Sequence, residues 1–179
     1  MKTIIYLTLL ASLSVGLNSC DSIFNSDDEA LAQEFYFQYE YLNHAWGYSH
    51  SGWLIDSLGN VWCYTLPENW NQSDSSGMID AAALKANLSK TDSVCHSIDM
   101  AVLKKKIKLI ENASSGTLQD PESVGADMGA MSYYAFVYEK KKDSYKRILL
   151  KKMGDWTIDN DAREADDLYE WMVEIQEGM

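Results

Sequence analysis

The stretch GWLIDSLGNVWCYTL, Gly52–Leu66, is the feature that most constrains the fold of this 179-residue chain. Two runs rich in branched and aromatic residues flank the turn-forming sequence DSLGN, Asp56–Asn60. Aspartate and asparagine accept hydrogen bonds from nearby backbone amides, and glycine adopts a positive φ without strain. The stretch therefore predicts a β-hairpin, and with it part of an antiparallel sheet.

Two further regions have the character of strands. Aromatic residues alternate in EFYFQYEYL, residues 34–42, which predicts a strand, although the spacing of the apolar residues fits a helix almost as well. Residues 132–139 and 145–152 flank a charged turn and predict a second hairpin.

Three segments have the character of helices. Residues 78–88 are rich in alanine, and residues 97–113 place apolar side chains on one side and lysines on the rest. Residues 161–176 form an amphipathic stretch in which Asp161 and Glu164 resemble a capping box. The order of elements predicts an α+β domain, with an antiparallel sheet built from two hairpin regions and about three helices packed on one face.

The N-terminal segment has the pattern of a secretion signal. Lys2 supplies a positive charge, and the uncharged apolar run Ile4–Leu17 follows it. This run is shorter than the roughly 20 residues that a spanning helix needs, and small and polar residues follow it. We expect residues 1–19 to be removed as a signal peptide.

The sequence LNSC, Leu17–Cys20, resembles the lipobox of bacterial lipoproteins, with an aliphatic residue three positions before the cysteine and a small residue directly before it. The resemblance implies that Cys20 is diacylated on sulfur, that the chain is cut before it, and that the new amino terminus is acylated. One acyl chain holds a protein to a bilayer only weakly, whereas two or three hold it stably. The resemblance therefore implies a lipid anchor that makes the membrane a partner of this chain.

The residues after Cys20 bear on which membrane carries the anchor. Asp21 resembles an inner-membrane retention signal of some Gram-negative lipoproteins, while the acidic run Ser26–Glu29 resembles a surface-export signal of other lineages. We expect the outer membrane, on its periplasmic or its surface face. Residues 20–30 are predicted to be a flexible acidic tether, and residues 31–179 a single domain.

The charge of the chain excludes one class of partner. Removing residues 1–19 removes Lys2 and no acid, so the mature chain has 14 basic and 27 acidic residues and a formal charge of −13. An acidic surface repels phosphates, which excludes nucleic acid. It also disfavours docking on anionic headgroups, which leaves the lipid as the membrane anchor. Glycine-rich phosphate loops are missing from the sequence, and it predicts no cofactor.

Two cysteines, Cys63 and Cys95, remain after Cys20. The compartment beyond the inner membrane permits disulfides. A bridge would close a loop of about 33 residues and stabilise the fold by about 3 to 4 kcal/mol in the chain-entropy model. Two buried thiols are the alternative, because a bridge requires Cα atoms that lie close together. A catalytic cysteine is disfavoured, since only the adjacent His96 suggests activation at Cys95.

The stretch NHAWGYSHSGWLID, residues 43–56, raises the question of a hydrolase site. Its segment GYSHSG suggests a nucleophile elbow, but neither Ser49 nor Ser51 has a glycine both two residues before and two residues after it. The strand and helix that flank such an elbow are also missing. The sequence therefore favours a domain without catalytic activity.

Metal sites are disfavoured by spacing. His44 and His50 are six residues apart, which matches neither a helical pair nor a zinc-finger pair. Read as a calcium loop from Asp155, the sequence has Asn160 where glycine is required and Asp166 where a bidentate glutamate is usual. We therefore expect no metal, and read this acidic stretch as a connection into the last helix.

Aromatic residues are concentrated in one segment, and five of them are candidate ligand-binding residues: Trp46, Tyr48, Trp53, Trp62 and Trp70. If exposed, such rings stack on sugars or hold a protein partner. If buried, they form core, which we favour because aromatic enrichment in strands needs no functional explanation. We therefore expect a non-catalytic binding or interaction domain in the cell envelope. The alternative is a glycan-binding module that uses the cluster at 46–70, and an envelope hydrolase is less favoured.

Overall fold

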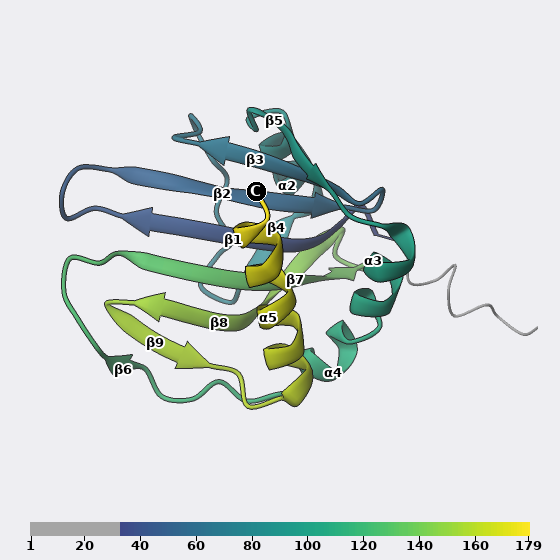
Figure 1. Ribbon diagram of the computed structural model, residues 1–179. Helices are drawn as coiled ribbons and strands as arrows, with labels where there is room; N and C mark the ends of the chain where they lie inside the picture. The colour runs from purple at the N-terminus through teal and green to yellow at the C-terminus, as the bar shows by residue number, and fades with distance from the viewer. Residues whose placement is uncertain (1–32) are drawn as a thin grey trace, which may run out of the picture.

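A computed structural model of the protein describes residues 33–179. Nine strands form an antiparallel sheet with helices packed against it, which is an α+β fold (Figure 1). The predicted signal peptide, Cys20 and the tether lie outside the described residues. Within the described part, no helix is both long and apolar enough to cross a membrane.

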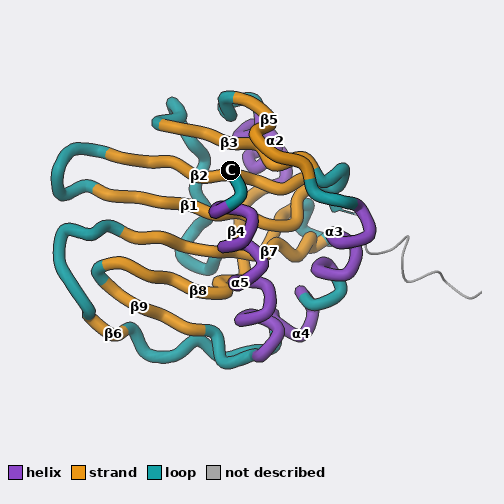
Figure 2. Tube along the Cα trace, in the orientation of Figure 1, coloured by secondary structure: helices purple, strands orange, loops and turns teal. Residues whose placement is uncertain are grey.

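The sheet runs in the order β5-β3-β2-β1-β7-β8-β9-β6, and β4 pairs with the first residues of β8. The strands are β1 (Phe35–Asn43), β2 (Ser49–Asp56), β3 (Asn60–Thr65), β4 (Met78–Asp80), β5 (Ser93–Ser97), β6 (Glu122–Ser123), β7 (Ala130–Glu139), β8 (Ser144–Gly154) and β9 (Trp156–Asp159). Because neighbouring strands are antiparallel, the β1–β2 and β8–β9 connections lie at one end of the sheet (Figure 2). The β2–β3 and β7–β8 turns lie at the other end.

The described helices are α2 (Ala81–Leu88), α3 (Met100–Ile107), α4 (Ile110–Ser114) and α5 (Arg163–Glu177). Asp80 caps α2 and Asp99 caps α3, each through a carboxylate that accepts from two backbone amides of the first turn. The predicted capping box of the last helix is wrong, because α5 has no side-chain cap. Asp161 instead accepts a hydrogen bond from the backbone nitrogen of Thr117 at 2.7 Å.

One face of the sheet, here called the α5 face, carries the larger core. Alternate side chains of β1, β2, β7 and β8 meet residues of α3, α4 and α5 there. The rings of Phe37 and Trp171 pack edge-on with centroids 5.0 Å apart. Leu168 and Met172 of α5 are fully buried against the same strands. The apolar stripe predicted for the last helix is therefore the side that covers the sheet.

The opposite face, here called the α2 face, carries a smaller apolar core. Its buried members are Phe35, Leu54, Ile79, Leu84, Phe136 and Tyr145. Leu84 belongs to α2, so the prediction that the helices pack on one face is wrong for residues 81–88. Periodicity indicates which helical residues are buried, but it does not indicate which side of a sheet they cover.

The boundaries of several elements differ from their predictions. Residues 35–43 form β1 rather than a helix, because this strand pairs with β2 on one side and with β7 on the other. Residues 78–80 form β4, and the helix that follows begins at Ala81. The predicted helix at 97–113 is divided into α3 and α4, and its first residue belongs to β5.

A disulfide joins Cys63 of β3 to Cys95 of β5, with Cα atoms 5.8 Å apart. All five residues of β5 are exposed, and the strand lies at the edge of the sheet. A short exposed edge strand contributes little burial of its own, so the covalent bond helps to hold it on β3.

The double variant Cys63→Ser, Cys95→Ser is expected to have a free energy of unfolding lower by about 3 kcal/mol, because its unfolded chain regains the freedom of the closed loop. Urea unfolding of the oxidised parent and of the variant measures this difference. The parent reduced with dithiothreitol should unfold at the same urea concentration as the variant. Equal stability of the oxidised parent and the variant would show that the bridge does not stabilise the fold.

Candidate functional site

The α2 face carries a buried polar cluster made of Glu40, His50, Tyr64, Gln72 and Arg147. Three strands supply its side chains, since Glu40 lies on β1, His50 on β2 and Arg147 on β8. His50 Nε2 lies 3.0 Å and Gln72 Nε2 lies 3.2 Å from Glu40 Oε1, while Arg147 Nη1 lies 3.5 Å from Glu40 Oε2. Glu40 is 6% exposed and His50 is 1% exposed, so the cluster is shielded from solvent.

The neighbours of Glu40 keep its carboxylate ionised. Burial raises the pKa of this group, but the hydrogen bond from His50, the Arg147 guanidinium and the hydrogen bond from Gln72 outweigh burial and lower the pKa below its ordinary value of 4.5. Because an ionised carboxylate only accepts hydrogen bonds, His50 Nε2–H is the donor in this contact. Burial and the negative charge of Glu40 raise the pKa of Tyr64 well above 10.0, so its phenol stays protonated.

Residues 66–77, here called the cover loop, connect β3 to β4 and lie over this cluster. Three hydrogen bonds join Asn71 to Asn87 of α2. The backbone nitrogen of Asn71 donates to Asn87 Oδ1 at 2.8 Å, Asn71 Nδ2 donates to the same oxygen at 3.0 Å, and Asn87 Nδ2 donates to the Asn71 carbonyl at 2.8 Å. Gln72 is the next residue, and its amide reaches Glu40. The loop is thus fixed to the helix and to the buried carboxylate at adjacent positions.

Aromatic rings close the remaining side of the cluster. The ring of Trp70, from the cover loop, lies 4.2 Å from that of Tyr64 and stands edge-on to His50 at 5.7 Å. Tyr64 fits over the sheet because Gly52 faces it in register, and a Cβ on Gly52 would overlap both the Tyr39 carbonyl oxygen and the Tyr64 hydroxyl. Glycine at position 52 is therefore required by packing rather than by a turn.

The cluster does not supply the machinery of a hydrolase. Ser49 and Ser51 flank His50 in β2, so their side chains leave the opposite face of the sheet. Within residues 33–179, His50 Nδ1 has no hydrogen-bond partner. No serine is thus presented to this imidazole as a nucleophile. The contacts support a fastening role, in which Glu40 accepts a hydrogen bond from Gln72 and so holds the cover loop onto the sheet.

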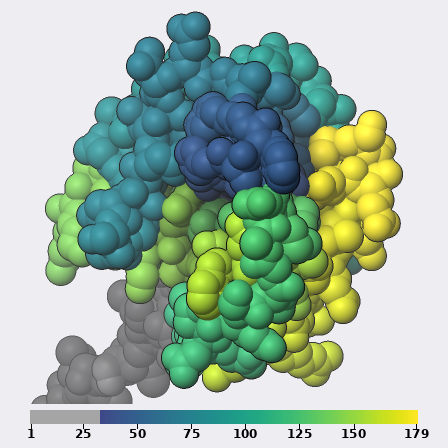
Figure 3. Space-filling view, turned by 90° about the vertical axis from the view of Figure 1, so that its left-hand side faces the viewer, coloured from purple at the N-terminus to yellow at the C-terminus, as the bar shows by residue number. Residues whose placement is uncertain are grey.

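A second candidate region is the loop end, made of the β1–β2 loop (44–48), residues 127–129 and the β8–β9 turn (155–156). Its exposed apolar side chains are Trp46, Tyr48, Met128 and Trp156, with exposed fractions of 83%, 55%, 52% and 48%. Asn43 Nδ2 donates to the Asp127 carbonyl at 3.2 Å, and the Met128 backbone nitrogen donates to Asp155 Oδ1 at 2.7 Å. These bonds join the three segments into one surface, which Figure 3 shows from that end.

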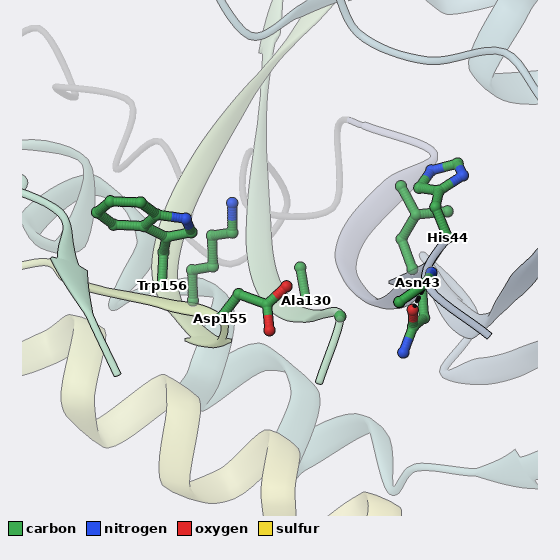
Figure 4. A pocket seen from close by; sticks show the side chains of 9 residues that line it. Asn43, His44, Ala130, Asp155 and Trp156 are labelled. Atoms are coloured by element: carbon green, nitrogen blue, oxygen red, sulfur yellow. Dashed lines mark hydrogen bonds between the residues drawn. The ribbon is translucent and has the colours of Figure 1, made fainter. Parts of the chain in front are cut away.

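A cavity of about 450 Å³ opens at the loop end on the α2 face. Figure 4 shows Asp155 and Trp156 on one side, Asn43 and His44 on the other, and Ala130 between them. Gly129 and Ala130 are small residues of the cavity lining, and Ala130 faces Gly154, which has a φ of 122°, in register. A Cβ on Gly154 would overlap the carbonyl oxygen of Gly129, so the close approach of β7 and β8 requires this glycine.

The structure divides the five aromatic candidates among different environments. Trp53 is 2% exposed in the core of the α5 face, which removes it from the candidate ligand surface. Trp62 is half-buried on the α2 face, where its indole donates to Asp56 Oδ2 at 2.8 Å, and Trp70 is half-buried over Tyr64. Trp46 and Tyr48 are exposed at the loop end, so only these two of the five are free to meet a large ligand.

Several residues of these two regions were missed by reading the sequence. Glu40 was read only as part of an aromatic strand, and Arg147 only as part of a hairpin. Trp156 was read inside an acidic connection, and only the structure shows that its side chain is exposed. Strand alternation could have placed Glu40 and His50 on one face, but not Arg147, which follows Glu40 by 107 residues.

Metal ligands do not gather in the described part of the chain, where no three His, Cys, Asp or Glu side chains are placed to hold an ion. Comparisons of the chain with family models, with curated proteins and with solved structures found no match. The functional argument therefore rests on the geometry of the loop end and of the buried cluster.

The Glu40→Gln variant is expected to lose about 3 kcal/mol of unfolding free energy at pH 7, because Arg147 is left beside a neutral side chain. Folding lowers the pKa of Glu40, so the contribution of its charge is fully present above the unfolded value near 4.5 and is lost as the pH falls through the folded value. Urea unfolding at pH 7 and at about pH 3 measures both stabilities, and the difference should shrink at the lower pH.

The matched control is Glu139→Gln, which removes a pair at 2.7 Å between half-buried Glu139 and exposed Lys142 and should change the stability by less than about 1 kcal/mol. A loss of the same size at both pH values in Glu40→Gln would contradict an ionised Glu40.

Proposed function

We propose that the protein is a non-catalytic binding domain of the bacterial cell envelope, anchored by lipid at Cys20, whose ligand surface is the loop end. The observation that carries this proposal is the gathering of Trp46, Tyr48, Met128 and Trp156, all exposed, around one end of the sheet. Contiguous exposed apolar side chains rimmed by polar residues are typical of interaction sites. The sealed polar cluster supports a role without catalysis.

The direction of the chain fits an anchor at the opposite end. The described chain begins at Gln33, just before the first residue of β1, and the loop end follows the last residue of that strand. The nine residues of β1 span about 30 Å at the usual rise of a strand. A lipid at Cys20 would therefore hold the domain by one end, with the loop end directed away from the bilayer. The outer membrane is the membrane we favour.

A glycan is the ligand class that we favour over a protein partner. The loop end is concave, with a cavity walled by Trp156 and His44, whereas protein partners dock mostly on broad flat surfaces. Exposed indole rings offer flat apolar faces, and the adjacent Asp155 offers an acceptor for hydroxyl groups. This combination is suited to sugar rings.

The Cys20→Ser variant is expected to leave the membrane fraction, because the acyl chains supply the anchor and the acidic domain does not dock on anionic headgroups. Partition between detergent and aqueous phases after expression in a Gram-negative host measures this. Cys63→Ser is the control and should stay in the detergent phase. A Cys20→Ser protein that remains in the detergent phase would contradict the lipid anchor.

The double variant Trp46→Ala, Tyr48→Ala is expected to lose at least tenfold in affinity for envelope polysaccharides on a glycan array, since each ring contributes about 1 kcal/mol or more of contact. Leu58→Ala is the matched control, because Leu58 is 73% exposed at the β2–β3 turn, at the other end of the sheet. A parent chain that binds no polysaccharide of the array, or a double variant that binds as well as the parent, would contradict the proposal.

A further inference from the structure

The cavity at the loop end contains a half-buried lysine without a counter-ion. Lys152 of β8 faces Ser132 in register, so its side chain leaves the sheet on the α2 face and reaches the cavity. Its neighbour Lys151 leaves the α5 face and pairs with Asp159 at 2.8 Å. Among the residues that the structure describes, no carboxylate lies within ion-pair distance of Lys152. A partly desolvated ammonium without a partner favours an anion in the cavity.

The side chains around Lys152 add two further features to the site. Trp156 is 48% exposed at the wall, and its indole offers a flat apolar surface. Asp155 Oδ1 accepts from the Met128 backbone nitrogen at 2.7 Å, which fixes the carboxylate and leaves Oδ2 to accept from a ligand hydroxyl. The site thus combines a cation, an aromatic platform and a hydrogen-bond acceptor.

We propose that this cavity binds an acidic sugar, a pyranose that carries a carboxylate. Its ring lies on Trp156, its carboxylate pairs with Lys152, and one of its hydroxyls donates to Asp155. The volume of about 450 Å³ falls within the usual range of small-ligand pockets. This inference rests on the proposed function and specifies the ligand that the loop end selects.

Other ligand classes fit the same residues less well. A cationic ligand that paired with Asp155 would place its charge beside Lys152, and a neutral sugar would leave the Lys152 ammonium unpaired. A phosphate group carries up to two negative charges, and among the described residues Lys152 is the one lysine or arginine that lines the cavity, where Asp155 also lies. A pyranose with one carboxylate offers one negative charge to the Lys152 ammonium and a ring that stacks on the Trp156 indole.

Calorimetric titration of the full chain in detergent micelles with D-galacturonic acid and with D-galactose tests the proposal, because these sugars differ only in the carboxylate at C6. D-galacturonic acid is expected to bind at least tenfold more tightly than D-galactose. A rising salt concentration should weaken the binding of the acid and leave that of D-galactose unchanged. Lys152→Met should abolish the preference, while Lys152→Arg, which restores the charge, should recover most of it. Trp156→Ala should lower the affinity for both sugars by at least tenfold.

Lys146→Met is the matched control, since Lys146 is an exposed lysine of the same strand that lies near the other end, and it should leave both affinities unchanged. Equal affinity for the two sugars, or a preference that survives Lys152→Met, would overturn the acidic-sugar assignment while leaving glycan binding intact. If neither sugar binds, the cavity is overturned as the site. Retention of polysaccharides through Trp46 and Tyr48 would then show separately that the proposed function stands.

Discussion

A buried carboxylate, that of Glu40, holds the α2 face of the sheet in its observed form. Removing a carboxylate from water costs several kcal/mol, so this group is stable inside only because His50, Gln72 and Arg147 surround it. Gln72 belongs to the cover loop, hence the contacts that stabilise the charge also fasten the loop onto the sheet. The cover loop shields His50, whereas Trp46, Tyr48 and Trp156 of the loop end are exposed.

This arrangement explains why the sheet carries different cores on its two faces. The α5 face is covered by helices and contains mainly apolar side chains. On the α2 face, Leu84 of α2 packs on the apolar side chains around Phe35. The cover loop shields the polar cluster on the same face. The residues of the cluster are buried, whereas those of the loop end, where we propose that a ligand binds, are exposed.

The parts of the fold that could be predicted are those whose signals lie close together in the sequence. Alternation and turn residues predicted the strands around the turn at 57–59, and the apolar stripe predicted a helix near the C-terminus, because these signals lie within a few residues of each other. The side of the sheet that α2 covers could not be predicted in this way. It depends on Leu84 meeting Phe35 and Tyr145, which are distant in the sequence.

The candidate site was predictable only in part, for the same reason. Trp46 and Tyr48 were singled out because aromatic residues are dense between 46 and 70, and the structure exposes both. Trp53 belongs to the same dense segment but lies in the core, because its position in β2 points it toward the α5 face. Lys152 and Trp156 come near His44 only through the pairing of β1 with β7 and of β7 with β8.

Fluorine NMR of the chain labelled with 5-fluorotryptophan, in the presence of a soluble gadolinium chelate, tests most directly whether the cover loop is closed while the loop end is open. The six tryptophans should broaden in a fixed order. Trp46 should broaden most and Trp156 next, Trp62 and Trp70 less, and Trp53 and Trp171 least. A Trp70 resonance that broadens as strongly as that of Trp46 would show that the cover loop does not seal the polar cluster, and would contradict the account.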